Sequence, residues 1–210
     1  MEHQENVWDL EYGERGTKWS RRRLAFPVSF EGKVVLEAGF GDGKTLSSII
    51  EKRPANVVAF DFSAVALERC REAFRDLKNV SFVKADAESL PFEAGSFDVV
   101  VAYYILDNML VEGRRKAVGE FFRVLRPGGF VLFEDFAVGD FREDLGKRVG
   151  MPEAHTLLKK KGLLCHYFSV EEVRELLSDF SNVEAGLKER KPVRNRPELV
   201  RRLVSAVALK

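Results

Sequence analysis

The sequence predicts an α/β fold in which one doubly wound, mostly parallel sheet carries helices on both faces. Short apolar runs alternate with amphipathic segments from residue 32 to residue 135. These runs are almost continuously apolar, which is typical of parallel strands buried on both faces. The alternation stops after residue 135, and two strand-like runs near the C-terminus predict an antiparallel strand at the edge of the sheet.

The individual elements follow from hydrophobic spacing and turn residues. Strands are expected at residues 33–39, 56–61, 80–86, 96–106 and 130–136, and later at 182–189 and 199–210. Helices are expected at 44–52, 63–77, 114–125 and 170–180. Ser63 and Ser169 are the expected N-caps, because a hydroxyl there accepts a hydrogen bond from the first helical turn. The turn-forming sequence RPGG, residues 126–129, stops the third helix.

The stretch from Glu37 to Thr45, EAGFGDGKT, has two interpretations. Counted from Ala38, A-x-x-x-x-G-K-T is a relaxed phosphate-binding loop of NTPases, with Ala where the strict pattern has Gly. Counted from Glu37, E-x-G-x-G-x-G is a loop that holds the methyl donor S-adenosylmethionine (SAM). The dinucleotide-binding pattern G-x-G-x-x-G does not fit, because the sixth residue from Gly39 is Lys44.

Motifs further along the chain favour the methyl-donor loop. Asp61 closes the second strand, where a ribose-binding carboxylate lies in nucleotide-binding sheets. Asp86 ends the third strand and is placed to accept from an adenine amino group. Asp98 stands at the start of the fourth strand, where the metal-binding acid of an NTPase would not lie. With the Pro-Gly-Gly turn, these motifs resemble class I SAM-dependent methyltransferases over residues 32–135, in the right order and spacing.

This resemblance implies a Rossmann-like fold, SAM as the cofactor and an enzyme that transfers methyl groups. The loop glycines at 39, 41 and 43 would let the backbone approach the methionine part of the donor and adopt positive φ. Glu37 would reach the donor's ammonium group, and Phe62 would pack on its adenine.

The N-terminal sequence resembles a narrower group, the tRNA 3-methylcytidine methyltransferases. VWDLEY is followed by TKWSRRRLAF before the first strand, and in that group a W-D-x-x-Y motif lies over the bound donor. The resemblance implies that residues 1–31 form an N-terminal helical segment closing the SAM site and that residues 32–210 form the methyltransferase domain. The implied cofactor contacts are Trp8, Tyr12, Trp19, Glu37, Gly39, Gly41, Asp61, Phe62, Asp86, Ala87 and Tyr103.

Two departures from the narrower group lie near the expected substrate entrance. Glu134 stands where the group has an arginine, and KKKGLLC replaces its D-G-T-R segment. Short matches in FEDFAVGDFR, HYFSVEEV and KERKPVRNR keep the resemblance along the rest of the chain. The methylated atom and the RNA target therefore stay open at this point.

The acceptor side is expected at the carboxyl ends of the fourth and fifth strands, because ligands bind there in open α/β sheets. Methyl transfer from a sulfonium is an in-line displacement that depends mainly on holding the nucleophile at attacking distance. Tyr104, Asp107 and Asn108 follow the fourth strand, and Asp135 closes the fifth. We expect Tyr104, Asp107 and Asp135 to be the catalytic residues, with helix capping or a loop ion pair as the alternative role of the two acids.

Positive charge is concentrated although the formal net charge is only +1. The segment from Lys188 to Arg202 carries seven basic and two acidic residues, and WSRRRL and LLKKKGLL add shorter clusters. Because such clusters neutralise phosphates, RNA (tRNA or rRNA) is the expected partner, with Arg194 and Arg196 among its contacts. Solvated surface segments are the alternative.

Other functions find little support in the composition. The cysteines at 70 and 165 lie far apart and the three histidines lack metal-binding spacing, so neither a disulfide nor a metal site is expected. No apolar run approaches a membrane span and no signal peptide is visible, which predicts a cytoplasmic protein. The charged content of 32% with little Gln or Cys is typical of thermophilic proteins.

Three functions fit these observations. The first, which we expect, is methylation of a cytidine base nitrogen in RNA. The second is a small-molecule methyltransferase of the quinone or metabolite type, built on the same core. The third is a non-catalytic, SAM-binding partner of another subunit.

Overall fold

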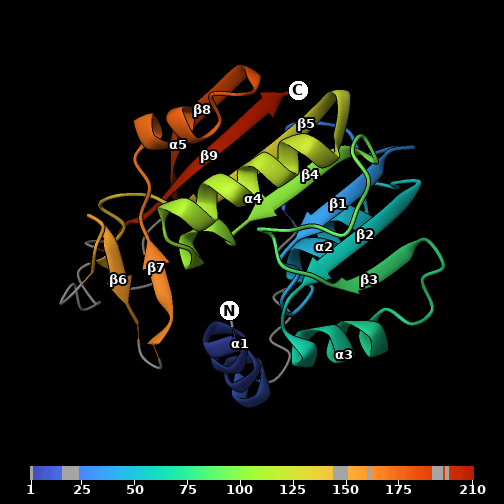
Figure 1. Ribbon diagram of the computed structural model, residues 1–210, viewed down its shortest axis with the longest axis horizontal. Helices are drawn as coiled ribbons and strands as arrows, with labels where there is room; N and C mark the ends of the chain where they lie inside the picture. The colour runs from blue at the N-terminus through green and yellow to red at the C-terminus, as the bar shows by residue number, and fades with distance from the viewer. Residues whose placement is uncertain (1, 16–23, 144–150, 160–161, 191–195, 197–198) are drawn as a thin grey trace.

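In the computed structural model, a mixed sheet of seven strands organises the chain (Figure 1). The structure describes residues 2–15, 24–143, 151–159, 162–190, 196 and 199–210. In sheet order the strands are β3 (Val80–Lys84), β2 (Asn56–Asp61), β1 (Val34–Ala38), β4 (Phe97–Tyr103), β5 (Leu125–Phe136), β9 (Arg201–Leu209) and β8 (Ser181–Arg190). The first five run parallel, and β9 and β8 pair antiparallel, which confirms the predicted fold class.

Helices cover both faces of this sheet (Figure 1). They are α1 (Glu2–Arg15), α2 (Lys44–Ile50), α3 (Ala64–Ala73), the short 3₁₀ helix η1 (Leu106–Asn108), α4 (Val111–Val124) and α5 (Val170–Leu176). Both predicted serine caps are present. The hydroxyl of Ser63 accepts from the Ala66 N–H at 3.1 Å, and that of Ser169 accepts from the Glu172 N–H at 3.0 Å.

Alternating side chains of each central strand pack into two separate hydrophobic cores, one on each face of the sheet. In β4, Val99 and Val101 pack on the α2–α3 side, while Val100 and Ala102 pack on the α4–α5 side. All four are buried, because helices cover both faces. This double burial is the reason that the strand sequence is continuously apolar rather than alternating.

The junction between α4 and β5 differs from the expected turn. β5 begins at Leu125, so the RPGG sequence lies within the strand, and the register with β4 shifts between Phe97 and Val99. α4 begins at Val111, three residues before its predicted start. The tertiary contacts of Glu153 account for this early start: its carboxylate accepts from the Val111 N–H at 2.6 Å and pairs with buried Arg114 at 2.7 Å.

A small antiparallel hairpin was not predicted. β6 (Thr156–Leu158) pairs with β7 (Leu164–His166), and the lysine cluster of LLKKKGLL lies between them. Three-residue strands are too short to display a hydrophobic period, which is why this segment indicated only surface charge. The hairpin and α1 lie on the same side of the molecule, that of the carboxyl ends of the parallel strands (Figure 1).

The N-terminal segment is helical over only part of its predicted range. α1 ends at Arg15, residues 24–31 contain no helix, and Leu24 and Phe30 are buried in the core on the α2 side. Trp19 lies outside the described residues. Among the helices that the structure describes, none has the length and apolar character needed to cross a membrane.

The packed start of β5 provides a test of the fold. A Cβ at Gly129 would lie 2.9 Å from the carbonyl oxygen of Arg126 and 3.0 Å from that of Asp98, so backbone must move to admit it. We expect Gly129→Ala to lower the free energy of unfolding by about 1–3 kcal/mol, the usual effect of overpacking. Denaturant unfolding measures this. Gly186→Ala in β8, where a Cβ meets no atom within 4 Å, is the control; equal effects of both substitutions would contradict the prediction.

Candidate active site

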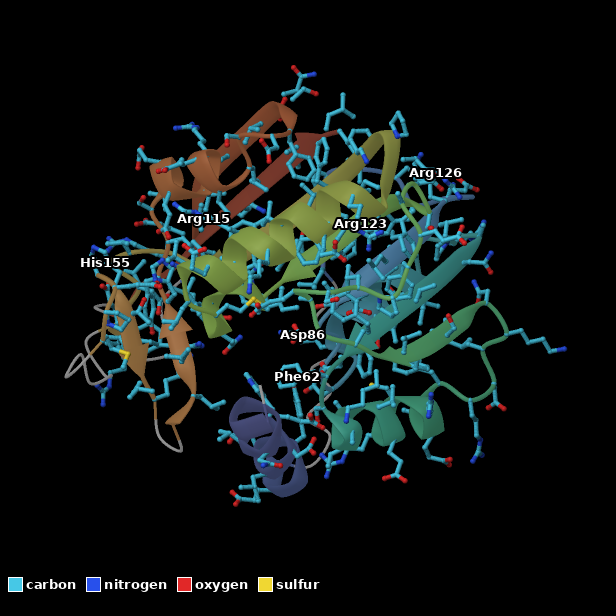
Figure 2. All side chains as sticks on the ribbon, viewed as in Figure 1. Phe62, Asp86, Arg115, Arg123, Arg126 and His155 are labelled. Carbon is cyan, nitrogen blue, oxygen red and sulfur yellow. The ribbon has the colours of Figure 1, made fainter. Side chains whose placement is uncertain are left out.

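A cavity of about 750 Å³ opens at the carboxyl ends of the parallel strands. Its size is in the range of sites that bind small molecules and cofactors. Phe62 and Asp86 lie near one another between α1 and the sheet (Figure 2). The sequence-predicted residues that line this cavity are Trp8, Tyr12, Gly39, Asp61, Phe62, Asp86, Ala87 and Tyr104.

The glycine loop after β1 adopts the backbone conformation that its sequence predicts. Gly39, Gly41 and Gly43 have φ values of 68°, 51° and 77°, which residues with a Cβ rarely adopt. A Cβ at Gly41 would lie 2.7 Å from the Tyr12 hydroxyl, and one at Gly39 would lie 3.0 Å from Ile105 Cδ1. The glycines therefore let α1 and the β4 end close over the loop.

Asp61 is the best-anchored acid of the cavity. Its Oδ2 accepts from the Gly41 N–H at 2.8 Å and its Oδ1 from the Ser63 N–H at 2.9 Å. Burial raises its pKa from 3.8 to about 6, against the lowering effect of the Ser63 and Gly41 hydrogen bonds. Each carboxylate oxygen has a second lone pair, so the group can still accept from the hydroxyls of a ribose.

Glu37 is a buried acid whose carboxylate oxygens have no hydrogen-bond partner among the described residues. Its side chain is 1% exposed. Burial raises the pKa of Glu37 well above its usual value, against a lowering effect of the Leu46 backbone, and the charges of Asp61 and Asp42 add to the rise. Glu37 is not among the residues that line the cavity, but it lies beneath the donor loop with the Leu46 backbone as a polar neighbour, and an ammonium group that reached it would restore the missing interactions.

Helix α1 is fastened to α3 by hydrogen bonds from two positions along its length. The Asp9 carboxylate accepts from the Ser63 hydroxyl at 2.5 Å and from the Val65 N–H at 3.3 Å. Arg69 of α3 donates to the Tyr12 carbonyl oxygen. The rings of Trp8 and Tyr12 stack at 5.3 Å and face the cavity. Sequence reasoning missed Asp9, although it is the acidic residue of the W-D-x-x-Y motif.

The opposite wall of the cavity is formed by the chain that follows β4. Tyr104 has φ 58°, an unusual value for a bulky residue, and its hydroxyl donates to Glu134 at 2.6 Å. The Asn108 amide nitrogen donates to Asp107 Oδ1 at 2.5 Å and to the Tyr104 carbonyl at 3.4 Å. Because both partners are acceptors, the amide oxygen of Asn108 is left as the group that can accept from a ligand in the cavity.

The structure does not bring Asp107 and Asp135 to the cavity surface. Both are buried, and Asp135 Oδ2 accepts from the Asp107 N–H at 3.1 Å. Burial raises the pKa of both acids, and for Asp135 the charge of Asp107 adds to this effect. Asp107 is connected to the cavity through Asn108, whose amide nitrogen donates to it. Tyr103 also lies away from the cavity, where its ring packs at 5.8 Å from that of Phe26.

The predicted basic segment is described only in part. Arg194 lies outside the described residues, and Arg196 is exposed. Lys188 and Arg190 both pair with buried Glu134, at 3.2 and 2.8 Å. A buried acid is therefore tolerated at position 134, because the two positive side chains of β8 neutralise the charge of Glu134. In the portion of the chain with described coordinates, no group of three or more His, Cys, Asp or Glu residues could hold a metal ion.

Comparison with known proteins identifies the class of this site. Residues 35–129 match the family model described as a methyltransferase domain. A SAM-dependent methyltransferase from Methanosarcina mazei superposes with a TM-score of 0.73 over 90% of this chain and 99% of its own, at 21% sequence identity. Residues 35–129 thus match a methyltransferase domain, and the chain has the fold of a SAM-dependent methyltransferase, in which the cavity at the carboxyl ends of the strands is the candidate site for SAM.

Two curated relatives differ in what they methylate. A demethylmenaquinone methyltransferase of Clavibacter sepedonicus is 39% identical over 115 residues, which cover 55% of this chain and 45% of the relative. A tRNA N(3)-methylcytidine methyltransferase, Mettl2, of Drosophila melanogaster is 26% identical over 203 residues, which cover 87% of this chain and 61% of the relative. The chain thus spans between two-fifths and two-thirds of the length of these relatives.

Asp61 gives a direct test of the donor site. A deprotonated carboxylate can accept from both ribose hydroxyls, whereas a protonated one loses its charge and turns one oxygen into a donor, so SAM affinity should fall as the pH drops through about 6, by up to tenfold per pH unit. We expect Asp61→Asn to weaken SAM binding at pH 7.5 by about tenfold or more, since lost hydrogen bonds to a charged group cost ~1.5–3 kcal/mol. The substitution should also flatten the pH dependence. Titration calorimetry between pH 5 and 8 measures both effects.

The control for Asp61→Asn is Asp76→Asn, an exposed acid after α3 that does not line the cavity. A pH slope retained by the Asp61→Asn variant belongs to Glu37, the other acid with a raised pKa in this region. Tight ATP binding without SAM binding would contradict the donor site. It would favour the interpretation of residues 37–45 as a phosphate-binding loop of NTPases.

Proposed function

We propose that this protein methylates a base nitrogen of cytidine in RNA, with SAM as the donor. The observation that carries the proposal is the extent of the likeness to the tRNA N(3)-methylcytidine methyltransferase, which includes 87% of this chain. The quinone-type relative aligns over 55%, which is close to the extent of the donor-binding region common to both classes. Resemblance outside the donor region is what separates the two candidate substrates.

The N-terminal helix supports this proposal through its position. Trp8 and Tyr12 of the W-D-x-x-Y motif line the cavity, and Asp9 holds the helix on the N-terminus of α3. The same acid therefore joins the aromatic cover to Ser63, two residues after Asp61. Such a cover excludes water from the donor and restricts the methyl group to the side where an acceptor enters.

The acceptor chemistry asks little of the protein. The N3 atom of cytosine carries a free lone pair at neutral pH, so it can attack the methyl group without a general base. The protein's task is to hold the ring in line with the sulfonium, which supplies most of the acceleration in such transfers. The amide oxygen of Asn108, held by Asp107, is the group that accepts from the exocyclic amino group of cytosine. Uracil has a carbonyl there and would be rejected.

A small-molecule acceptor is the second candidate, and it is favoured by the 39% identity to the demethylmenaquinone methyltransferase. The cavity wall near Asn108 is partly apolar, with Ile105, Met109, Leu110 and Leu164 among its lining residues. A flat aromatic or quinone ring would suit such a wall. The two candidates differ in whether a base amino group is needed, which an experiment can decide.

Nucleoside mass spectrometry tests the RNA proposal. The purified protein is incubated with SAM and unmodified transcripts, and the digested nucleosides are analysed. We expect methylated cytidine, and we expect Asn108→Ala to reduce its formation by at least about tenfold, the effect of losing one positioned hydrogen bond. SAM affinity should stay within about twofold.

Asn56→Ala, an exposed position at the start of β2, is the matched control for Asn108→Ala. Methylation of a demethylated quinone, with no methylated nucleoside formed under the same conditions, would replace the RNA proposal by the second candidate.

The aromatic cover can be tested separately from the substrate. Deleting residues 1–19 should leave the sheet folded, because α1 contributes Val7 but no strand to the body. We expect the deletion to weaken SAM binding by at least about tenfold and to abolish methyl transfer. Asp9→Ala should have a smaller effect in the same direction, since it removes the contact with Ser63 but not the stacked rings.

Circular dichroism reports the fold, and calorimetry reports the donor affinity. Asn6→Ala, on an exposed position of the same helix, is the control for Asp9→Ala. A truncated protein with full donor affinity and turnover would show that α1 is not a cover.

A further inference from the structure

Three positive side chains surround one aromatic ring at the end of β5. The Cζ atom of Arg142 lies 5.0 Å from the centroid of the Phe136 ring, the Cζ atom of Arg201 lies 5.1 Å from it, and Lys159 Nζ lies 5.1 Å from it. Any two of these positive groups are therefore within about 10 Å of one another, a Debye length at ordinary ionic strength. All three side chains are half-buried, which limits the screening of their repulsion by water.

In the described part of the chain, four acids face this cluster: Glu134, Asp140 and the buried pair Asp107 and Asp135, whose pKa values the charge of Lys159 lowers against a larger rise from burial. Glu134 is neutralised by Lys188 and Arg190. Asp140 approaches Arg201 only at 3.9 Å, and its carboxylate also accepts from the Arg142 and Arg202 backbone N–H groups at 3.0 and 2.8 Å.

Among the residues that the structure describes, no carboxylate lies within ion-pair distance of Arg142 or Lys159. Burial lowers the pKa of Arg201, and the charge of Arg142 adds to this effect, as does that of Arg190 to a smaller extent. Asp140 opposes this lowering, and burial favours the neutral forms of Asp107 and Asp135, so these acids offset the three positive side chains only in part.

The cluster lies directly beside the cavity. The Phe136 ring is 5.4 Å from that of Tyr104, which lines the cavity on its acceptor side. Lys159 follows β6, and Leu164 of the paired strand β7 is itself a lining residue. A group that extends out of the cavity past Tyr104 would meet the three cations at once.

We propose that Arg142, Lys159 and Arg201 bind a phosphate group of the acceptor substrate at the entrance of the cavity. The two guanidinium groups can each present a pair of parallel N–H donors to phosphate oxygens, and the ammonium group adds a point charge. The identity of the ligand rests on the proposed function: if the substrate is RNA, the phosphate is a phosphodiester next to the target cytidine. The cluster itself requires only that the substrate carry a phosphate.

This site also accounts for a feature that the narrower resemblance left unexplained. The KKKGLLC segment, which replaces the D-G-T-R sequence, begins with Lys159 and so brings a cation to Phe136. Packing of cations on Phe136 for stability alone is the competing explanation. It predicts no preference for phosphate over other anions.

The first experiment uses inorganic phosphate as the probe and needs no substrate. Thermal unfolding of the full chain is measured in phosphate and in chloride at equal pH and ionic strength. We expect phosphate to raise the unfolding midpoint of the wild-type protein, because a ligand that binds only the folded state stabilises it. The rise should disappear in Lys159→Gln and Arg142→Gln and persist in Arg75→Gln, an exposed arginine between α3 and β3 that pairs with Glu72.

The second experiment uses the methylation reaction. With RNA as the acceptor, Lys159→Gln and Arg142→Gln should raise KM by about tenfold or more, leave kcat within about twofold, and leave SAM affinity unchanged. The slope of log KM against log salt should fall by ~0.7–0.9 for each phosphate that the variant no longer neutralises. Arg75→Gln should match the wild-type protein in all these measurements.

The outcomes separate this site from the proposed function. A phosphate-independent midpoint in the wild-type protein would overturn the site even if RNA is methylated. A phosphate-dependent midpoint that the substitutions remove, in a protein that methylates only small acceptors, would retain the site and reject the RNA proposal. An unchanged KM and an unchanged salt slope in both variants would also overturn the site.

Discussion

The carboxylate of Asp61 is the interaction on which the geometry of the site depends. One of its oxygens holds the Gly41 N–H of the donor loop and the other holds the Ser63 N–H at the start of α3. Ser63 in turn donates to Asp9, so the same chain of hydrogen bonds reaches the N-terminal helix. Loop, helix α3 and aromatic cover are therefore fixed relative to one another before a donor binds. Preorganisation of this kind lowers the entropy lost on binding.

This arrangement concentrates negative charge in the interior, which has a cost. Glu37 and Asp61 lie under the donor loop, and Asp107 and Asp135 lie under the acceptor wall, each with a pKa raised by burial. Buried acids without cationic partners destabilise a folded protein. Asp61 lines the cavity and Glu37 lies beneath its loop, where a ligand with positive charge, such as the ammonium and sulfonium groups of SAM, would supply the missing interactions. These acids lower the stability of the folded protein, and they do so at the place where a positively charged ligand would bind.

Most of the donor half was predictable from sequence because its rules are local. Continuous apolar strands, serine caps and glycines with positive φ each depend on a few neighbouring residues, and β1 to β4 with α2 and α3 follow them closely. The acceptor half depends on contacts between distant segments. The start of α4 is set by Glu153, some forty residues later, and the β6–β7 strands are too short to show a period. No local pattern distinguishes Asp107, which faces the interior, from its neighbour Asn108, which faces the cavity.

The two cysteines lie under opposite walls of the same cavity. The Cys70 thiol donates to the Gly41 carbonyl at 3.5 Å, beneath the donor loop, and the Cys165 thiol donates to Asp107 at 3.5 Å, beneath the acceptor wall. Burial raises the pKa of both thiols, to about 12 for Cys165, so neither reacts while its wall is closed. Each sulfur is thus a built-in reporter of local opening. The alkylation rates of Cys70 and Cys165 would therefore measure how often each wall of the cavity opens. A lower rate in the presence of a ligand would show which wall that ligand holds closed.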